Sequence, residues 1–278
     1  MNTPIIDFHF HVTTADEYSE WFMGWLGEYA GEATLAHLRQ VLSSPQAILE
    51  YLDEQGVDYA VALAETNPLI TGTSPNERVA ELCQSSDRLI PFANINPYVT
   101  ADLVGELRHC VNDLGCCGLK LYPTYQHFYV NDARLYPLYD EAQRLSVPIM
   151  VHTGSSVFRG ARLKYGDPLY VDDVVVDFPE LTMIMAHSGR GFWYDAAFFM
   201  AQLHRNVYME ITGLPPLKLP ACFPNLERNA DKIIFGSDWP ALTDIRGNIA
   251  AVRSLELSEE SKAKILGGNA ARVLGLTK

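Results

Sequence analysis

The sequence lacks the features that mark membrane proteins and nucleic-acid-binding proteins. No stretch approaches the roughly 18 consecutive apolar residues that a membrane-spanning helix needs, so no membrane partner is expected. Basic residues are scarce, because 21 Lys and Arg stand against 34 Asp and Glu, and the net charge is −13. A chain of this charge, without a basic run, repels a phosphate backbone, which excludes nucleic acid as a partner.

Cysteine is also rare, and no export signal is visible. The five cysteines are an odd number without C-x-x-C spacing, which is typical of reduced thiols in the cytoplasm. The first residues, MNTPIIDFHFHV, contain no basic segment, apolar segment or small-residue cleavage site. Hydrophobic residues nevertheless make up 48% of the chain. We therefore expect a cytoplasmic globular protein with a large core.

Eight β-rich segments alternate with amphipathic segments along the whole chain. This order predicts parallel strands with helices outside them, and eight such units are the number in a (β/α)8 TIM barrel. A doubly wound open sheet is the alternative, but the first strand is not followed by a glycine-rich phosphate loop. We expect one domain over residues 1–278. The predicted strands are 5–11, 57–64, 89–95, 117–122, 148–152, 181–187, 206–211 and 232–237, and predicted helices include 75–86, 101–114, 133–145, 194–204 and 222–229.

A long segment separates the first two predicted strands. Residues 13–50 contain Trp21, Phe22, Trp25 and Tyr29 and are predicted to form a helical insertion over the mouth of the barrel. The alternative interpretation is ordinary packing of an extra helix.

The first strand carries two histidines in the motif IDFHFHV. Since side chains alternate along a strand, Asp7, His9 and His11 are expected to face into the barrel, and Phe8 and Phe10 to face the helices. Two imidazoles on one face can bind the same metal ion. The alternative is two histidines satisfied by hydrogen bonds inside the barrel.

Three further polar residues stand at the ends of predicted strands: His152, His187 and Asp238. In a TIM barrel the active site is built at the carboxyl ends of the strands, so these side chains and His9 and His11 are expected to form one ring. Imidazoles with one carboxylate are ligands that zinc prefers, and a catalytic site keeps one position open. The ring predicts a divalent metal and a small-molecule substrate, although Asp238 alone could be a turn residue.

The motifs IDFHFHV, VHTG, AHSG, GSDWP and GNAARVLGL resemble the amidohydrolase-related (amidohydrolase 2) family of metal-dependent amidohydrolases, from residue 4 to about 275. That family includes both decarboxylases and hydrolases on a TIM barrel. The resemblance implies that His9, His11, His152 and Asp238 hold one ion, zinc or alternatively manganese, and that His187 is catalytic. It also implies a homodimer.

The favoured reaction is hydrolysis of a small anionic carbonyl compound, such as a lactone, an amide or the C–C bond of a cleavable diketone, by metal-activated water. Either Asp238 or His187 would then accept the proton of that water. A non-oxidative decarboxylase is the alternative within the enzymes. A metal-binding barrel without catalysis is the alternative outside them.

Lys120 is expected to point into the barrel, because Leu119 and Leu121 beside it suit the outer face. A buried amine is costly unless it has a partner. Lys120 is therefore interpreted as an ion pair with Glu65 or Glu210, or as a substrate contact. The segment GLKLYP is also similar to the strand of dihydroorotases that carries a carboxylated lysine bridging two metals, which would imply a second ion shared by His152 and His187.

Three more residues are predicted to bind substrate. Tyr122 shares the inward face of Lys120, and Arg159 and Arg162 follow the strand that ends at His152. Arginines at this position can hold an anion through paired hydrogen bonds. The alternative for both arginines is a solvated loop.

Overall fold

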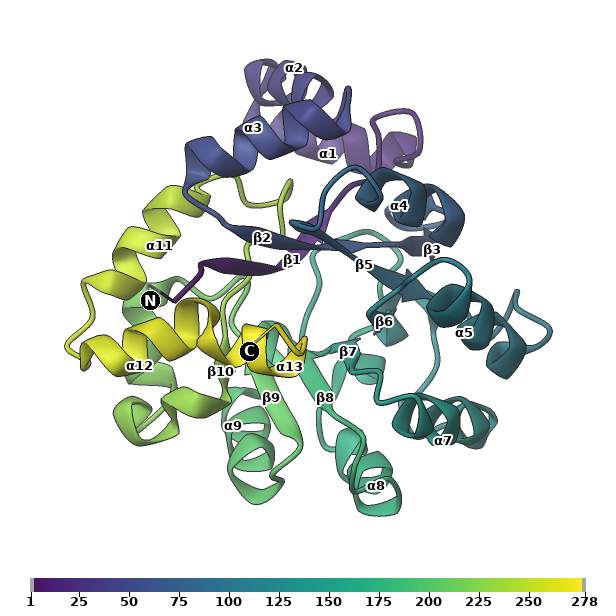
Figure 1. The fold of residues 1–278 in the computed structure, drawn as a ribbon, viewed down its shortest axis with the longest axis vertical. Helices are drawn as coiled ribbons and strands as arrows, with labels where there is room; N and C mark the ends of the chain where they lie inside the picture. Colours follow the sequence, from purple (N-terminus) through teal and green to yellow (C-terminus); the bar gives the residue numbers. More distant parts are fainter. Residues whose placement is uncertain (1–2, 277–278) are drawn as a thin grey trace.

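The computed structural model describes residues 3–276, and eight parallel strands form its central element (Figure 1). Neighbouring strands pair in the order β1-β2-β5-β6-β7-β8-β9-β10. Their bounds are Ile6–His11 (β1), Tyr59–Leu63 (β2), Leu89–Asn94 (β5), Gly118–Leu121 (β6), Ile149–His152 (β7), Met183–Ala186 (β8), Val207–Glu210 (β9) and Ile233–Ile234 (β10). All eight strands lie within the predicted segments.

The two edge strands of this sheet meet and close it. Phe8 N donates to Phe235 O at 3.0 Å, and His11 N donates to Trp239 O at 3.0 Å. In the opposite direction, Asp238 N donates to His9 O at 2.9 Å. Closure leaves no exposed sheet edge and brings the first and last strands side by side. The predicted TIM barrel is confirmed.

Helices surround the barrel, as Figure 1 shows. They are α1 (Glu20–Ala30), α2 (Glu32–Val41), α3 (Pro45–Gln55), α4 (Asn76–Cys83), α5 (Leu103–Asn112), α6 (Pro123–Gln126), α7 (Tyr136–Arg144), α8 (Tyr170–Asp177), α9 (Tyr194–Leu203), α10 (Leu219–Cys222), α11 (Ile245–Arg253), α12 (Glu259–Ala263) and α13 (Asn269–Val273). No helix among residues 3–276 is long and apolar enough to cross a membrane.

One predicted helix, 222–229, is wrong. The short α10 ends at Cys222, and a separate 3₁₀ segment runs over Leu226–Lys232. Between them Asn225 has a φ of 55°, which no right-handed helix contains, and the preceding Pro224 has no N–H to donate. The predicted helix is therefore interrupted at these two residues, because their backbone conformation and hydrogen bonding do not suit a helix.

The segment 13–50 contains α1, α2 and the start of α3. Aromatic residues of α1 pack around Phe158, which follows β7, with ring centroids 5.3 Å away for Phe22 and 5.0 Å away for Trp25. A short hairpin, β3 (Glu65–Asn67) and β4 (Gly72–Ser74), follows β2. Residues of these segments, Tyr18, Phe22, Glu65 and Thr71 among them, line the cavity at the carboxyl end of the barrel.

Apolar residues form two layers that leave one end of the barrel for a site. An outer layer lies between strands and helices, and a smaller inner cluster fills the barrel with residues such as Ile6, Phe8 and Phe92. Ala270 and Ala271 of α13 belong to this inner cluster and close the amino end of the barrel. Polar side chains are therefore expected only at the carboxyl end.

Candidate metal centre

The first strand contains a β-bulge at the position of its first histidine. Pairing with β2 shifts register between Asp7 and Phe10, so the strict alternation predicted for this strand is wrong. Phe8 faces into the barrel, against Phe92 at 5.4 Å, instead of facing the helices. Phe10 faces outward as predicted and stacks on Trp239 at 4.6 Å. A bulge re-aims the residues that follow it, and here it brings His9 to the carboxyl end of the barrel.

Asp7 braces the backbone and does not face the ring of histidines. Its Oδ1 accepts from His9 N at 3.1 Å and from Ser237 N at 2.9 Å. Burial raises the pKa of this carboxyl to about 7, although the hydrogen bonds from Ser237 and His9 oppose the shift. Asp7 thus joins β1 to the loop that carries Asp238.

Asp238 lies between the two histidines of β1. Its Oδ1 is 3.2 Å from His9 Nε2 and 3.4 Å from His11 Nε2. Ligands around a tetrahedral zinc at about 2.0–2.1 Å stand roughly 3.3 Å apart, so these spacings suit a shared ion. Burial opposes ionisation of Asp238, but His9 and His11 outweigh it and hold its pKa well below the usual range.

A carboxylate fixes the tautomer of His9. Glu210 Oε2 lies 3.1 Å from His9 Nδ1 and also accepts from His187 N at 3.2 Å, while Oε1 accepts from Thr212 N at 2.7 Å. With both oxygens accepting, Nδ1 of His9 carries the proton and Nε2 presents a lone pair. That lone pair faces the Asp238 carboxylate, and only a cation between them makes the arrangement favourable.

His152 and His187 form a second pair of imidazoles. His187 Nδ1 lies 3.3 Å from Thr212 O, a pure acceptor, so Nδ1 carries the proton of the neutral ring. Nε2 of His187 then accepts from His152 Nδ1 at 3.1 Å. This leaves His152 Nε2 with a lone pair, buried and without a hydrogen-bond partner among the described residues. Burial, followed by nearby cationic groups, lowers the pKa of both histidines well below the usual value.

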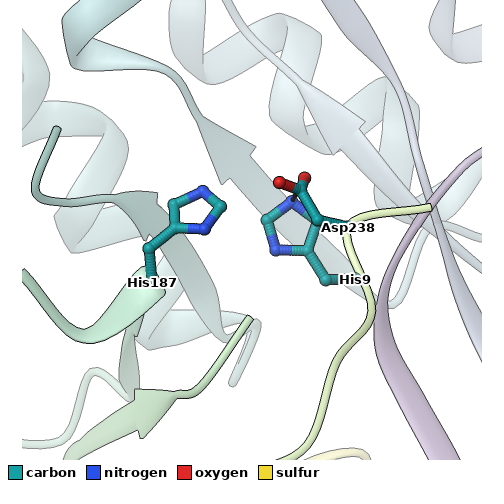
Figure 2. A group of neighbouring side chains, drawn as sticks. All are labelled: His9, His187 and Asp238. Atoms are coloured by element: carbon teal, nitrogen blue, oxygen red, sulfur yellow. Dashed lines mark ion pairs between the residues drawn. The ribbon is translucent and has the colours of Figure 1, made fainter. Parts of the chain in front are cut away.

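Figure 2 shows His187 facing His9 and Asp238, and the ligand atoms of these three residues all lie within 4.8 Å of one another. The site thus offers the Asp238 carboxylate and two imidazole lone pairs, those of His9 and His152. This donor set fits a divalent metal ion.

The cavity beside these residues is small and aromatic. It encloses only about 20 Å³ and is lined by the rings of Tyr18, Phe22, Tyr122, Tyr125 and Phe158. The remaining lining residues are His9, His11, Glu65, Thr71, His152, His187, Asp238, Pro240 and Ala241. Walls of this kind suit a small planar molecule with a polar end.

The other predicted residues lie in different places. Lys120 faces into the barrel as predicted, but it forms no ion pair with Glu65 or Glu210. Tyr122 lines the cavity, and its hydroxyl donates to Ala64 O at 3.1 Å. The structure does not bring Arg159 and Arg162 to the cavity, because both are exposed on the loop after β7. Their role in substrate binding stays a prediction.

Sequence reasoning missed the positions of two buried acids. Glu65 and Glu210 were considered only as partners of Lys120, yet Glu210 holds His9, and Glu65 lines the cavity. Both follow an apolar strand segment, the same signal that identified His152 and Asp238. Tyr125 was missed because it lies on the short α6, after the strand rather than in it.

Comparisons with known proteins agree with this geometry. A family model described as amidohydrolase matches residues 6–276. The chain is 24% identical over 249 residues to the gamma-resorcylate decarboxylase of Rhizobium sp. (strain MTP-10005), which covers 72% of this chain and 75% of that protein.

Two solved structures share the barrel fold. An uncharacterised TIM-barrel protein from Bordetella bronchiseptica has a TM-score of 0.76 and 23% identity, over 98% of both chains. A dihydroxybenzoic acid decarboxylase from Polaromonas sp., with bound manganese and the inhibitor 2-nitroresorcinol, has a TM-score of 0.73 and 18% identity, over 100% of this chain and 98% of that one.

Proposed function

This chain belongs to the amidohydrolase family, and we propose that it is a metal-dependent decarboxylase of a small, planar carboxylic acid. Of the two reactions expected from the sequence, the similarity to gamma-resorcylate decarboxylase favours decarboxylation over hydrolysis. The aromatic lining of the cavity supports the same choice, because the faces of its five rings can pack against a flat substrate.

The observation that supports a metal is the Asp238 carboxylate against the Nε2 atoms of His9 and His11, together with the unpartnered, buried Nε2 of His152 in the same cavity. We assign His9, His11, His152 and Asp238 as ligands of one divalent ion. Manganese is the first candidate, because a structural neighbour binds it, and zinc is the second. Such an ion would bind substrate oxygens and withdraw electron density from the bond to be broken.

A second ion held by Lys120 and His187 is disfavoured. Nε2 of His187 already accepts a hydrogen bond from His152, so its lone pair is used. Elemental analysis of the purified protein tests this assignment. One ion per chain is expected, and two ions that are lost in Lys120→Ala would contradict it.

Decarboxylation breaks the bond between the carboxylate carbon and the ring, releases carbon dioxide and places a proton on the ring carbon. Asp238 and His187 both line the cavity and can move that proton. Both ring nitrogens of His187 are hydrogen-bonded, to Thr212 O and to His152, so His187 takes this role only when the substrate displaces the hydrogen bond from His152. The aromatic walls hold the substrate and exclude water.

The experiment is turnover of a panel of hydroxybenzoic acids, lactones and amides by the manganese-loaded protein, with carbon dioxide measured directly. We expect release from an acid and no turnover of lactones or amides. His187→Asn should keep the metal content near wild type while turnover collapses. Loss of metal in this variant would instead make His187 a ligand, and a fully loaded but inactive wild-type protein would favour a binding protein.

A further inference from the structure

Lys120 lies in the middle of β6, at the level of Asn94 and Met150 in the neighbouring strands, and is fully buried. Its ammonium has no hydrogen-bond partner among residues 3–276. The nitrogen lies 5.2 Å from the ring centroid of Tyr122, one of the cavity walls. The side chain therefore places an unpaired cation just behind the cavity.

Each nearby carboxylate is already occupied by other donors. Glu65 accepts from Thr13 Oγ1 at 2.8 Å, from Asn67 Nδ2 at 3.1 Å and from Thr71 Oγ1 at 2.5 Å. Glu210 is held by His9 and by two backbone N–H groups, and Asp238 lies against His9 and His11. The protein thus satisfies its own acids without using Lys120.

Lys120 therefore stays charged without an ion-pair partner in the protein. Burial lowers the pKa of Lys120 to about 8, and the field of Glu210, Asp238 and Glu65 opposes a larger drop, so the amine is mostly charged at neutral pH. An unpaired buried charge is costly and is retained only where another group compensates it.

We propose that the Lys120 ammonium, behind the Tyr122 wall, attracts the carboxylate of the substrate through that wall and so selects anionic acids over neutral analogues. This inference rests on the proposed function, because a decarboxylase must bind a carboxylate. Arg159 and Arg162 are not needed for it, since Lys120 supplies the counter-charge where water is excluded. The attraction between opposite charges is stronger in such a place than in water.

The test uses benzoate and its neutral analogue benzamide as probes of the manganese-loaded protein, with binding measured by calorimetry. We expect the wild-type protein to bind benzoate at least about tenfold more tightly than benzamide, because only the anion is attracted by the ammonium. Lys120→Met should remove this preference and leave benzamide affinity and manganese content within twofold of wild type. Lys218→Met, which removes an exposed lysine, is the matched control and should keep the preference.

The thermal stability of the variants distinguishes a loss of binding from a loss of folding. Removing an unpaired buried charge should leave the Tm of the probe-free Lys120→Met protein at or above that of wild type. Lys120→Gln is measured in parallel as a polar replacement and should lose the same preference. The proposal is overturned if the wild-type protein shows no preference for benzoate, if both variants keep it, or if both lose manganese, which would place Lys120 in the metal site. Failure of the wild-type protein to release carbon dioxide from any acid would refute the proposed function alone.

Discussion

Replacing Glu210 by Gln should weaken metal binding without removing any proposed ligand. The carboxylate accepts from His9 Nδ1 at 3.1 Å, from His187 N at 3.2 Å and from Thr212 N at 2.7 Å, so both oxygens are used. An amide has only one oxygen, and its NH2 group must therefore face a donor. In one orientation His9 Nδ1 and His187 N lose their acceptor, and in the other Thr212 N loses it. In both orientations the negative charge that favours the proton on His9 Nδ1 is removed, so the tautomer that directs the Nε2 lone pair toward Asp238 is less favoured.

The size of the effect follows from these contacts. A buried hydrogen bond to a charged acceptor contributes about 1.5–3 kcal/mol. Loss of the residue that orients a metal-binding histidine typically lowers metal affinity by about 10- to 100-fold, or roughly 1.4–2.8 kcal/mol. Since Glu210 is fully buried and solvent does not screen it, we expect a loss within this range.

The assay is competition between the protein and a chelator of known manganese affinity, at pH 7.5, for wild type and Glu210→Gln. Glu141→Gln is the matched control, because Glu141 is also buried but is held by Arg108 and Arg144 on the outer helices. Manganese affinity in the control should stay within twofold of wild type. An equally small change in Glu210→Gln would refute the orienting role of this carboxylate.

Two further variants test the structure around the site. Hydrogen bonds from Arg108 and Arg144 lower the pKa of Glu141 from 4.5 to about 2, so its ion pairs stabilise the fold above pH 4.5 and are lost as the pH falls toward 2. Urea unfolding should therefore show Glu141→Gln less stable than wild type at pH 7. A difference in unfolding free energy that does not shrink below pH 4.5 would contradict the shift. A Cβ at Gly236 would collide with Glu210 Oε1 and lie 2.8 Å from His9 Cβ, so Gly236→Ala should lower both Tm and bound manganese, whereas Gly24→Ala on α1, with no atom within 4 Å, should change neither.

The sequence predicted the barrel and the ring of polar residues because both follow local patterns. An apolar run of four to six residues that ends in His or Asp signals a buried strand and the carboxyl end of a barrel at once. His152, His187 and Asp238 all met this rule, and the structure places them together with His9. These predictions needed no knowledge of loops.

The rest depended on contacts between distant segments. The bulge in β1 arises from pairing with β2, so no period-two rule could predict that Phe8 turns inward. The partners of Glu210 lie 201 and 23 residues away, at His9 and His187, and only the closed barrel reveals them. The exposure of Arg159 likewise reflects a loop conformation that its sequence does not specify.

The central claim is that a metal held by His9, His11, His152 and Asp238 supports decarboxylation. The most direct measurement is turnover of the accepted acid in H2¹⁸O by manganese-loaded and metal-stripped protein, with mass spectrometry of the organic product. The account predicts one carbon dioxide per product, no ¹⁸O in that product, and activity only with metal. Incorporation of ¹⁸O into the organic product without release of carbon dioxide would contradict it and establish a hydrolase.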